Sequence, residues 1–194
     1  MNVNERRFNP NKQGELIRSE RQARWNPARL LAKLGIRPGQ RVLDLGCGPG
    51  FWTLPLAEIV GENGMVWALD VSQEMLKALA EGKPPRQVQL LHSELPIIRL
   101  AEKTVDWIWG AFVVHEVEPL DDLVWEMRRV LRPGGQLAIL DWRPEATLDD
   151  GPPRHHRIPS ERIIKQLERV GFESSMLDWE DEESYLIGAT LQVR

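Results

Sequence analysis

Short apolar runs alternate with amphipathic segments along most of this chain. Helical spacing of the apolar residues predicts helices at 51–60 and 121–131, and a third helix that Ser72 caps. Strands that alternate with helices predict a doubly wound α/β fold, in which a mostly parallel sheet carries helices on both faces. The candidate strands of this sheet are residues 41–45, 66–70, 88–91, 106–112 and 136–141.

The N-terminal part adds an arm and two helices to this core. Residues 1–14 are rich in Asn, Arg and Lys, which is typical of a mobile arm. A helix is expected at 15–25, so residues 1–25 as a whole are a candidate lid. Asn26 is placed to cap the next helix, which carries Pro in its first turn and ends at Gly35.

The C-terminal part predicts a hairpin. The R-P-G-G segment at 132–135 is expected to end the preceding helix, and Ser160 is placed to cap a helix that runs to 170. Segments 173–179 and 184–193 flank an acidic turn, and their short link predicts an antiparallel pair at the sheet edge. The prediction is therefore a seven-stranded Rossmann-like sheet. No repeat or linker is visible, so residues 1–194 are interpreted as one domain.

A glycine-rich turn follows the first candidate strand. The segment V-L-D-L-G-C-G-P-G spans residues 42–50, and Asp70 ends the next apolar run. Such glycines let a ligand approach the backbone, and an acid at the position of Asp70 can accept from both hydroxyls of a ribose. The third glycine of a dinucleotide fingerprint falls on Phe51, and Asp44 would repel a pyrophosphate but suit a cation. These features favour a cationic nucleoside ligand over a dinucleotide with a pyrophosphate.

The nonamer resembles motif I of the class I S-adenosylmethionine (SAM) methyltransferases. The segments V-D-W-I-W (105–109), V-H-E-V (114–117) and V-L-R-P-G-G (130–135) resemble further parts of that family, and the chain looks most similar to its small enzymes of ubiquinone and menaquinone biosynthesis. The resemblance implies SAM as cofactor and S-adenosylhomocysteine (SAH) as product. The cofactor-binding residues that it implies are Asp44 near the methionine ammonium, then Gly46, Cys47, Gly48, Gly50, Asp70, Val71, Ser93, Glu94, Leu95, Gly110 and Ala111.

His115 is the candidate catalytic residue. It comes just after the fourth candidate strand, at the edge where ligands of such sheets bind. A histidine there can take a proton from a hydroxyl, an amine or an activated carbon, and Glu116 could orient it. A histidine that begins a helix and bonds to the backbone is the alternative. Trp142 is a candidate wall of the site.

A second group of histidines lies before the last helix. His155, His156 and Arg157 are candidates for an acceptor lid. A metal site is not expected, because the two histidines are adjacent and Cys47 is the single cysteine.

Composition and net charge limit the classes of methyl acceptor that we expect. The 194 residues carry a net charge of −4, which argues against a dominant electrostatic grip on nucleic acid. No apolar run is long enough to insert in a membrane and the start is unlike a signal peptide, so a cytoplasmic enzyme is expected. A small-molecule acceptor is the prediction, and a homodimer stays open. An RNA or protein acceptor stays open too, through a basic cluster of Arg6, Arg7, Lys12, Arg18, Arg21 and Arg24, as does a non-catalytic SAM-binding module.

Overall fold

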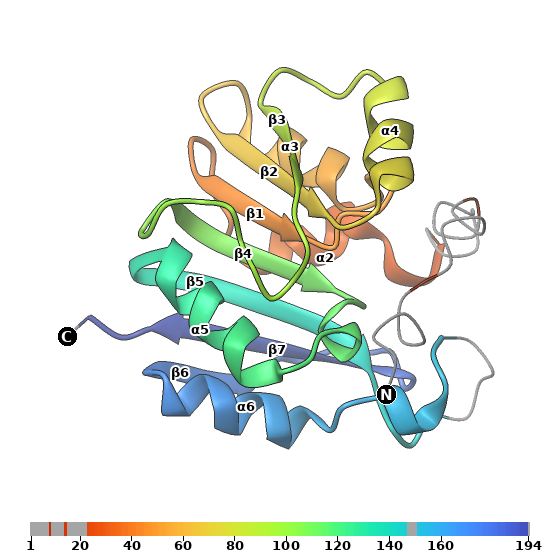
Figure 1. Ribbon diagram of the computed structural model, residues 1–194, viewed down its shortest axis with the longest axis vertical. Coiled ribbons are helices and arrows are strands. Elements are labelled where there is room, and N and C mark those ends of the chain that lie inside the picture. Colours follow the sequence, from red (N-terminus) through yellow and green to blue (C-terminus); the bar gives the residue numbers. More distant parts are fainter. Residues whose placement is uncertain (1–7, 9–13, 15–22, 147–150, 194) are drawn as a thin grey trace. The chain divides into compact units, whose positions relative to one another are not determined.

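A computed structural model describes residues 8, 14, 23–146 and 151–193 of the chain. Its strands form one seven-stranded sheet in the order β3-β2-β1-β4-β5-β7-β6 (Figure 1). The predicted mostly parallel, Rossmann-like sheet with a C-terminal antiparallel hairpin is confirmed. The chain divides into two compact units, an N-terminal unit (Phe8–Glu94) and a C-terminal unit built on Leu95–Arg194.

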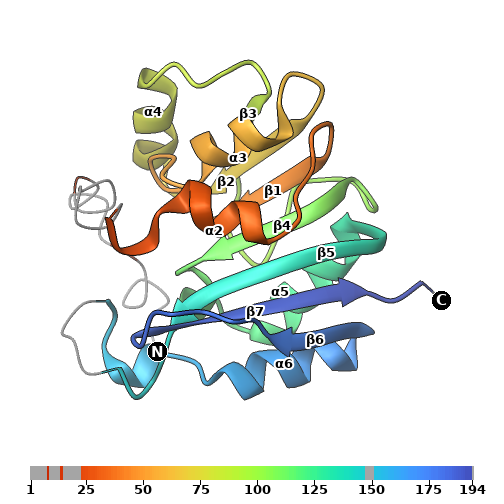
Figure 2. The ribbon, with the colours of Figure 1, turned by 180° about the vertical axis from the view of Figure 1, so that it is seen from behind.

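The N-terminal unit carries three parallel strands. Strand β1 pairs with β2, and β2 pairs with β3, each in parallel register. Helices α2 and α3 contact each other, and both lie on the face of this unit that Figure 2 turns to the viewer. The elements in order are α2 (Pro27–Lys33), β1 (Arg41–Leu45), α3 (Thr53–Val60), β2 (Met65–Asp70), α4 (Gln73–Glu81) and β3 (Val88–His92).

The predicted helix boundaries in this unit rest on local chemistry. The side chain of Asn26 accepts a hydrogen bond from the amide of Arg29 at 3.2 Å and so caps α2. The Ser72 hydroxyl accepts from the amide of Met75 at 3.3 Å and caps α4. Both caps confirm the prediction. Helix α4 buries the apolar face expected for it, at Met75, Leu76 and Leu79.

The C-terminal unit contains the hairpin. Strand β4 pairs with β5 in parallel, whereas β7 runs antiparallel to both β5 and β6. Helices α5 and α6 contact each other and lie on the face that Figure 1 shows. The elements are β4 (Val105–Ala111), η3 (Val114–Glu116), α5 (Leu120–Val130), β5 (Leu131–Trp142), η4 (Arg154–His156), α6 (Ser160–Arg169), β6 (Phe172–Met176) and β7 (Ser184–Leu191).

Several element boundaries differ from the prediction, among them the end of β6 at Met176, the start of β5 and the start of α6. Strand β5 begins at Leu131, which pairs with Val105, and regular pairing resumes only where Gln136 meets Trp107. The R-P-G-G segment therefore bulges within the strand, because Pro lacks an amide donor and Gly134 has a φ of 76°. Ser160 is the first residue of α6 and the N-cap position is Pro159, which makes no side-chain capping hydrogen bond, so the predicted Ser160 cap is wrong.

Several N-terminal predictions lie outside the described residues. These predictions are most of the arm at 1–14, most of the helix at 15–25, and five members of the basic cluster. Of the predicted helix, only residues 23–25 are described, and they are helical. The sixth member, Arg24, stacks its guanidinium 5.0 Å from the centre of the Trp25 ring. Among the described helices, none is long and apolar enough to cross a membrane.

Candidate active site

The glycine-rich turn of the N-terminal unit follows the carboxyl end of β1. Gly46, Gly48 and Gly50 have φ values of 71°, 54° and 101°, a region that side chains with a Cβ rarely adopt. The amides of Gly46 and Cys47 both donate to the carbonyl of Leu69, at 2.9 Å each. The turn is therefore held against the end of β2.

Asp70 fastens the same turn to the start of α4. Its Oδ2 accepts from the amide of Gly48 and its Oδ1 from the amide of Ser72, each at 2.8 Å. Burial raises the pKa of Asp70, and the amides that it accepts from work in the opposite direction. Each carboxylate oxygen still has a second lone pair for a ligand hydroxyl. The predicted ribose role is compatible with this geometry and stays a prediction.

Asp44 is the most unusual group of the turn. It is 1% exposed, and its Oδ2 accepts a hydrogen bond of 2.6 Å from the Thr53 hydroxyl. Its Oδ1 has no hydrogen-bond partner among the described residues. Burial raises the pKa of Asp44 to about 7, against the opposing Thr53 hydrogen bond. A buried oxygen without a partner is costly, and a cationic N–H donor would satisfy it. Asp44 Oδ1 is thus a hydrogen-bond acceptor that fits the ammonium of SAM.

Packing explains two of the other predicted cofactor residues. A Cβ on Gly50 would lie 2.5 Å from Cδ1 of Leu79, so close packing of α4 requires a glycine there. The Cys47 side chain lies in a buried cluster with Ala68, Leu76 and Leu79, and burial raises the pKa of its thiol. A ligand contact at Cys47 would therefore use the backbone.

The remaining predicted cofactor residues fall in both units. In the N-terminal unit Ser93 is buried and its amide donates to the Asp70 carbonyl at 3.2 Å, Glu94 is exposed, and the Val71 carbonyl lies 3.0 Å from Nε2 of His92. In the C-terminal unit Leu95 is half-buried, and Gly110 and Ala111 are buried at the carboxyl end of β4. Their contact with SAM stays a prediction.

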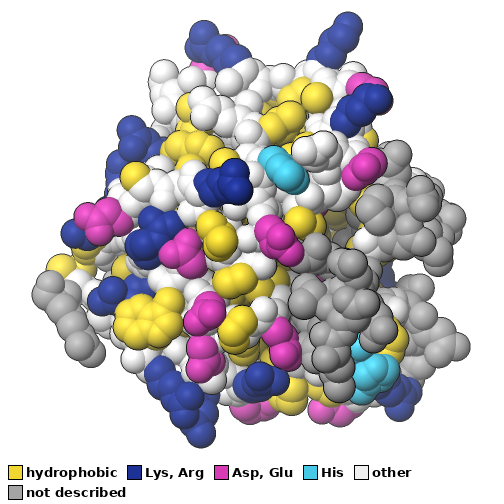
Figure 3. Space-filling view, in the orientation of Figure 1, with side chains coloured by type: hydrophobic (Ala, Val, Ile, Leu, Met, Phe, Trp, Pro, Cys, Tyr) yellow, Lys and Arg dark blue, Asp and Glu magenta, His cyan; other side chains and the backbone are white. Residues whose placement is uncertain are grey.

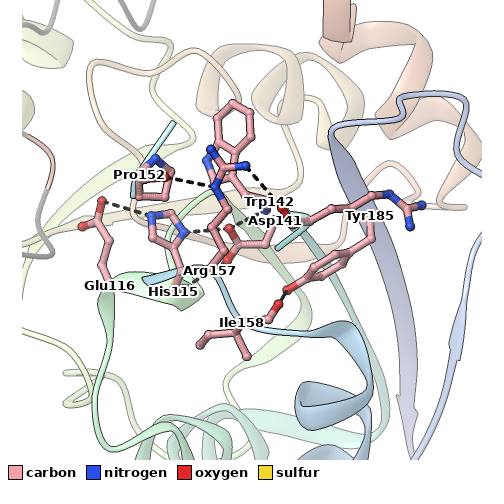
Figure 4. A network of polar contacts seen from close by, with 9 residues as sticks. His115, Glu116, Asp141, Trp142, Pro152, Arg157, Ile158 and Tyr185 are labelled. Carbon is pink, nitrogen blue, oxygen red and sulfur yellow. Dashed lines mark hydrogen bonds and ion pairs between the residues drawn. The ribbon is translucent and has the colours of Figure 1, made fainter. Parts of the chain in front are cut away.

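His115 lies in the short 3-10 turn η3 of the C-terminal unit. Its Nδ1 donates to Oδ1 of Asp141 at 2.6 Å, and its backbone amide donates to Oδ2 of the same carboxylate at 3.1 Å (Figure 4). Oδ1 also accepts from the amide of Trp142 at 2.8 Å. The ring is therefore bonded to a carboxylate and not to the backbone, and the catalytic role of His115 stays a prediction.

Charged neighbours set the protonation of His115. Burial of the ring lowers its pKa, but the carboxylates of Asp141 and Glu116 raise it more, and Arg157 opposes them. Oε1 of Glu116 lies 3.9 Å from Nε2, on the side of the ring away from Asp141 (Figure 4). The result is a pKa above the ordinary value of a histidine, in a side chain that is 4% exposed.

The predicted acceptor lid is partly a fixed structure. Arg157 is buried and donates to the carbonyls of Pro152 at 3.0 Å, Arg143 at 3.3 Å and Ala146 at 3.4 Å. Ile158 follows Arg157, and its carbonyl accepts a hydrogen bond from the Tyr185 hydroxyl at 2.9 Å. Arg157 therefore holds its own loop together. Within the predicted lid, residues 147–150 lie outside the described part.

The neighbouring side chains differ in exposure. His155 is exposed, whereas His156 is buried, and their rings lie 4.2 Å apart. The Trp142 ring packs against the Phe112 ring, with 4.7 Å between the ring centres, and against Gly151. Its observed contacts are therefore those of a packed side chain, and its predicted role as a wall of the site stays a prediction. No three His, Cys, Asp or Glu side chains of the described ranges gather in a way that could hold a metal ion.

Two partners were missed by reasoning from the sequence. Asp141 lies within one residue of the carboxyl end of its strand, as Asp44 and Asp70 do, and that shared position was the available signal. Thr53 follows Asp44 by nine residues in the next helix and carried no signal of its own.

Comparison with known proteins places the chain among methyltransferases in sequence and in fold. The methyltransferase domain family matches residues 42–135. The chain is 32% identical to a SAM-dependent methyltransferase from Aquifex aeolicus, covering 95% of this chain and 100% of that one with a TM-score of 0.88. A SAM-dependent methyltransferase from Mesorhizobium loti, 20% identical with a TM-score of 0.72 over 87% of this chain and 97% of the other, shares the fold.

Curated relatives match a shorter segment. The demethylmenaquinone methyltransferase of Lysinibacillus sphaericus is 37% identical over 110 residues, which are 56% of this chain and 47% of that protein. The protein of the same name from Bacillus cereus is 36% identical over 111 residues, with the same two shares. The match thus spans about half the length of these relatives.

Proposed function

The chain belongs to the class I SAM-dependent methyltransferases, and we propose that it methylates a small molecule by in-line displacement. The observation that carries the proposal is the buried Oδ1 of Asp44, which lacks a hydrogen-bond partner among the described residues. A carboxylate oxygen in that state calls for a cationic donor, which the methionine ammonium of SAM supplies and a nicotinamide dinucleotide does not.

The chain's own residues bind and orient the cofactor. When bound, SAM supplies a methyl group on a cationic sulfur that is already a good electrophile. Asp44 would accept from the ammonium, and Thr53 would keep Asp44 aligned. Asp70 would accept from the ribose hydroxyls while it holds the glycine turn closed. Alignment of reactants in a dry site can lower a barrier by about 7–11 kcal/mol, so positioning is the main catalytic task of the protein.

A small molecule is the acceptor class that we favour. Two curated relatives are named as acting on demethylmenaquinone, so a demethylated quinol is the first acceptor to test. On the face that Figure 3 shows, basic and acidic side chains are interspersed among the described residues, and an RNA acceptor would favour a continuous basic surface. The same proposal includes a cytoplasmic location and a single domain over residues 1–194, with a homodimer as the alternative to a monomer.

Methyl transfer itself tests this proposal. Purified protein is incubated with methyl-labelled SAM and, in parallel, a reduced demethylmenaquinone analogue, bulk RNA or a protein extract. Label in the quinol fraction supports the proposal. Label only in RNA or protein would replace it with the macromolecular alternative. SAM binding without transfer to any acceptor would favour the non-catalytic module.

A further inference from the structure

The carboxylate of Asp141 determines which nitrogen of His115 carries a proton. Its oxygens accept three N–H groups: Nδ1 and the backbone amide of His115, and the amide of Trp142. The two amides can only donate, so the carboxylate is fixed as an acceptor that faces Nδ1. A neutral His115 must therefore keep its proton on Nδ1 and its lone pair on Nε2.

We propose that Asp141 is a positioning residue that keeps Nε2 of His115 ready as the base for an acceptor hydroxyl, which makes hydroxyl-bearing small molecules the substrate class. This inference rests on the proposed methyltransferase function. A base oriented by a second group is a recurrent arrangement for proton removal. Asp141 is 1% exposed, so water does not compete for its hydrogen bonds.

The proton balance indicates why the acceptor needs such a base. For an acceptor methylated on oxygen, that oxygen forms a bond to the methyl carbon; for a quinol, the ring carbon beside the ionised hydroxyl forms this bond and then releases its own ring proton to water. In both cases the methyl–sulfur bond breaks and its electron pair stays on sulfur. The hydroxyl proton passes to Nε2, which gives an imidazolium that later returns the proton to water. A thiol ionises by itself near neutral pH and needs this help far less than a hydroxyl with a pKa near that of tyrosine, about 10.

The charged and titratable groups around His115 come from four places. They are Asp141 on β5, Glu116 beside the histidine on η3, Arg157 after η4, and Tyr185 on β7. The Tyr185 hydroxyl is engaged with Ile158, and burial raises the pKa of its phenol, so it stays neutral. The two carboxylates thus dominate, and the base becomes free only as pH rises past the raised pKa of His115.

Nitrogen NMR of the full-length protein in excess SAH tests the positioning role without any acceptor. The His115 ring is assigned by comparison with His115→Gln. We expect the Nδ1–H tautomer, with a pKa above the ordinary histidine value of about 6.5. Asp141→Asn should shift the proton to Nε2, whereas the control Glu116→Gln should lower the pKa and keep the tautomer. An Nε2–H tautomer in the native protein, or a ring that stays protonated at every pH, would overturn the proposal.

The rate of methyl transfer is a second measurement, and replacing a histidine with a merely structural role would not change how this rate depends on pH. The same proteins are offered labelled SAM with a phenol, a hydroquinone and, for contrast, a thiol and an amine. We expect transfer to a hydroxyl acceptor whose kcat rises with pH, and a loss of about 10²–10⁴-fold in kcat in His115→Gln with SAH binding retained. SAH binding with transfer to the thiol or amine alone, to no acceptor, or equally in His115→Gln would overturn the inference. Failure of the native protein to bind SAH would instead refute the proposed function.

Discussion

Thr53 donates a hydrogen bond of 2.6 Å from Oγ1 to Oδ2 of Asp44, whereas the buried Oδ1 of the same carboxylate has no hydrogen-bond partner among the described residues. Thr53 begins α3, shortly after the glycine turn, so the helix fixes the direction of the acid next to the end of β1. A rigid carboxylate with one unsatisfied oxygen is a device for binding a cation.

Asp44→Asn should weaken SAH binding about 10–100-fold, because a charge-assisted hydrogen bond of about 1.5–3 kcal/mol is lost. Isothermal titration calorimetry measures the change. Thr53→Ser keeps the hydroxyl and serves as the matched control, with affinity close to that of the native protein. Equal SAH affinity in Asp44→Asn and the native protein would remove Asp44 from the cofactor site.

The ligand-free protein should lose stability between about pH 4 and pH 7 through Asp44. The ordinary pKa of an aspartate is 3.8, and that of Asp44 in the fold is about 7, so in this window the folded state holds a proton that the unfolded state has lost. Stability contributed by the protonated group is complete at lower pH and falls as pH rises, by up to roughly 4 kcal/mol.

Urea unfolding at several pH values measures this effect. Asp44→Asn cannot ionise, so its stability relative to the native protein should improve as the pH is raised. Glu58→Gln, which changes an exposed carboxyl on α3, is the control and should show no such trend. A pH-independent difference between Asp44→Asn and the native protein would contradict the buried, unpaired state of the acid.

Gly50→Ala should destabilise the protein by about 1–3 kcal/mol, because its Cβ would overlap the buried Leu79 side chain in addition to the cost of a positive φ. Gly39→Ala is the matched control, since Gly39 also has a positive φ but open space around it. Denaturant unfolding should find the Gly50 variant clearly less stable than the Gly39 variant. Equal losses would mean that backbone conformation alone explains the glycine.

Arg157→Lys should cost about 1–3 kcal/mol of stability, because one ammonium cannot reach the three carbonyls that the guanidinium spans. Arg154→Lys, an exposed change on the neighbouring turn η4, should cost close to nothing. Urea unfolding compares the two. Similar stability of both variants would show that the carbonyl contacts of Arg157 do not hold the loop.

Local signals predicted the fold well. The bounds of β1 were predicted without error, and the Asn26 and Ser72 caps were found because each acts on an amide three residues away. The start of β5 was missed because Leu131 pairs with Val105 across a bulge, and strand pairing between distant segments leaves no mark in local periodicity.

The site was predicted only in part, because one of its contacts also joins segments that are distant in the sequence. The acids at strand ends and the position of His115 can be read along the chain. The sequence offered only the adjacent Glu116 as a group that could orient His115, but the carboxylate that the His115 ring contacts at 2.6 Å is Asp141, 26 residues away on the next strand. Only the pairing of β4 with β5 brings the two segments together.

Thermal unfolding of the whole protein with SAM, SAH and NAD in parallel tests the central claim most directly. At a hundred times its dissociation constant a ligand adds about 2.7 kcal/mol, or a rise in Tm of about 5–10 °C for a chain of this size. We predict this rise for SAM and SAH, its loss in Asp70→Ala, and its retention in Glu74→Ala, which removes an exposed acid from the same helix start. A rise with NAD alone would contradict the account.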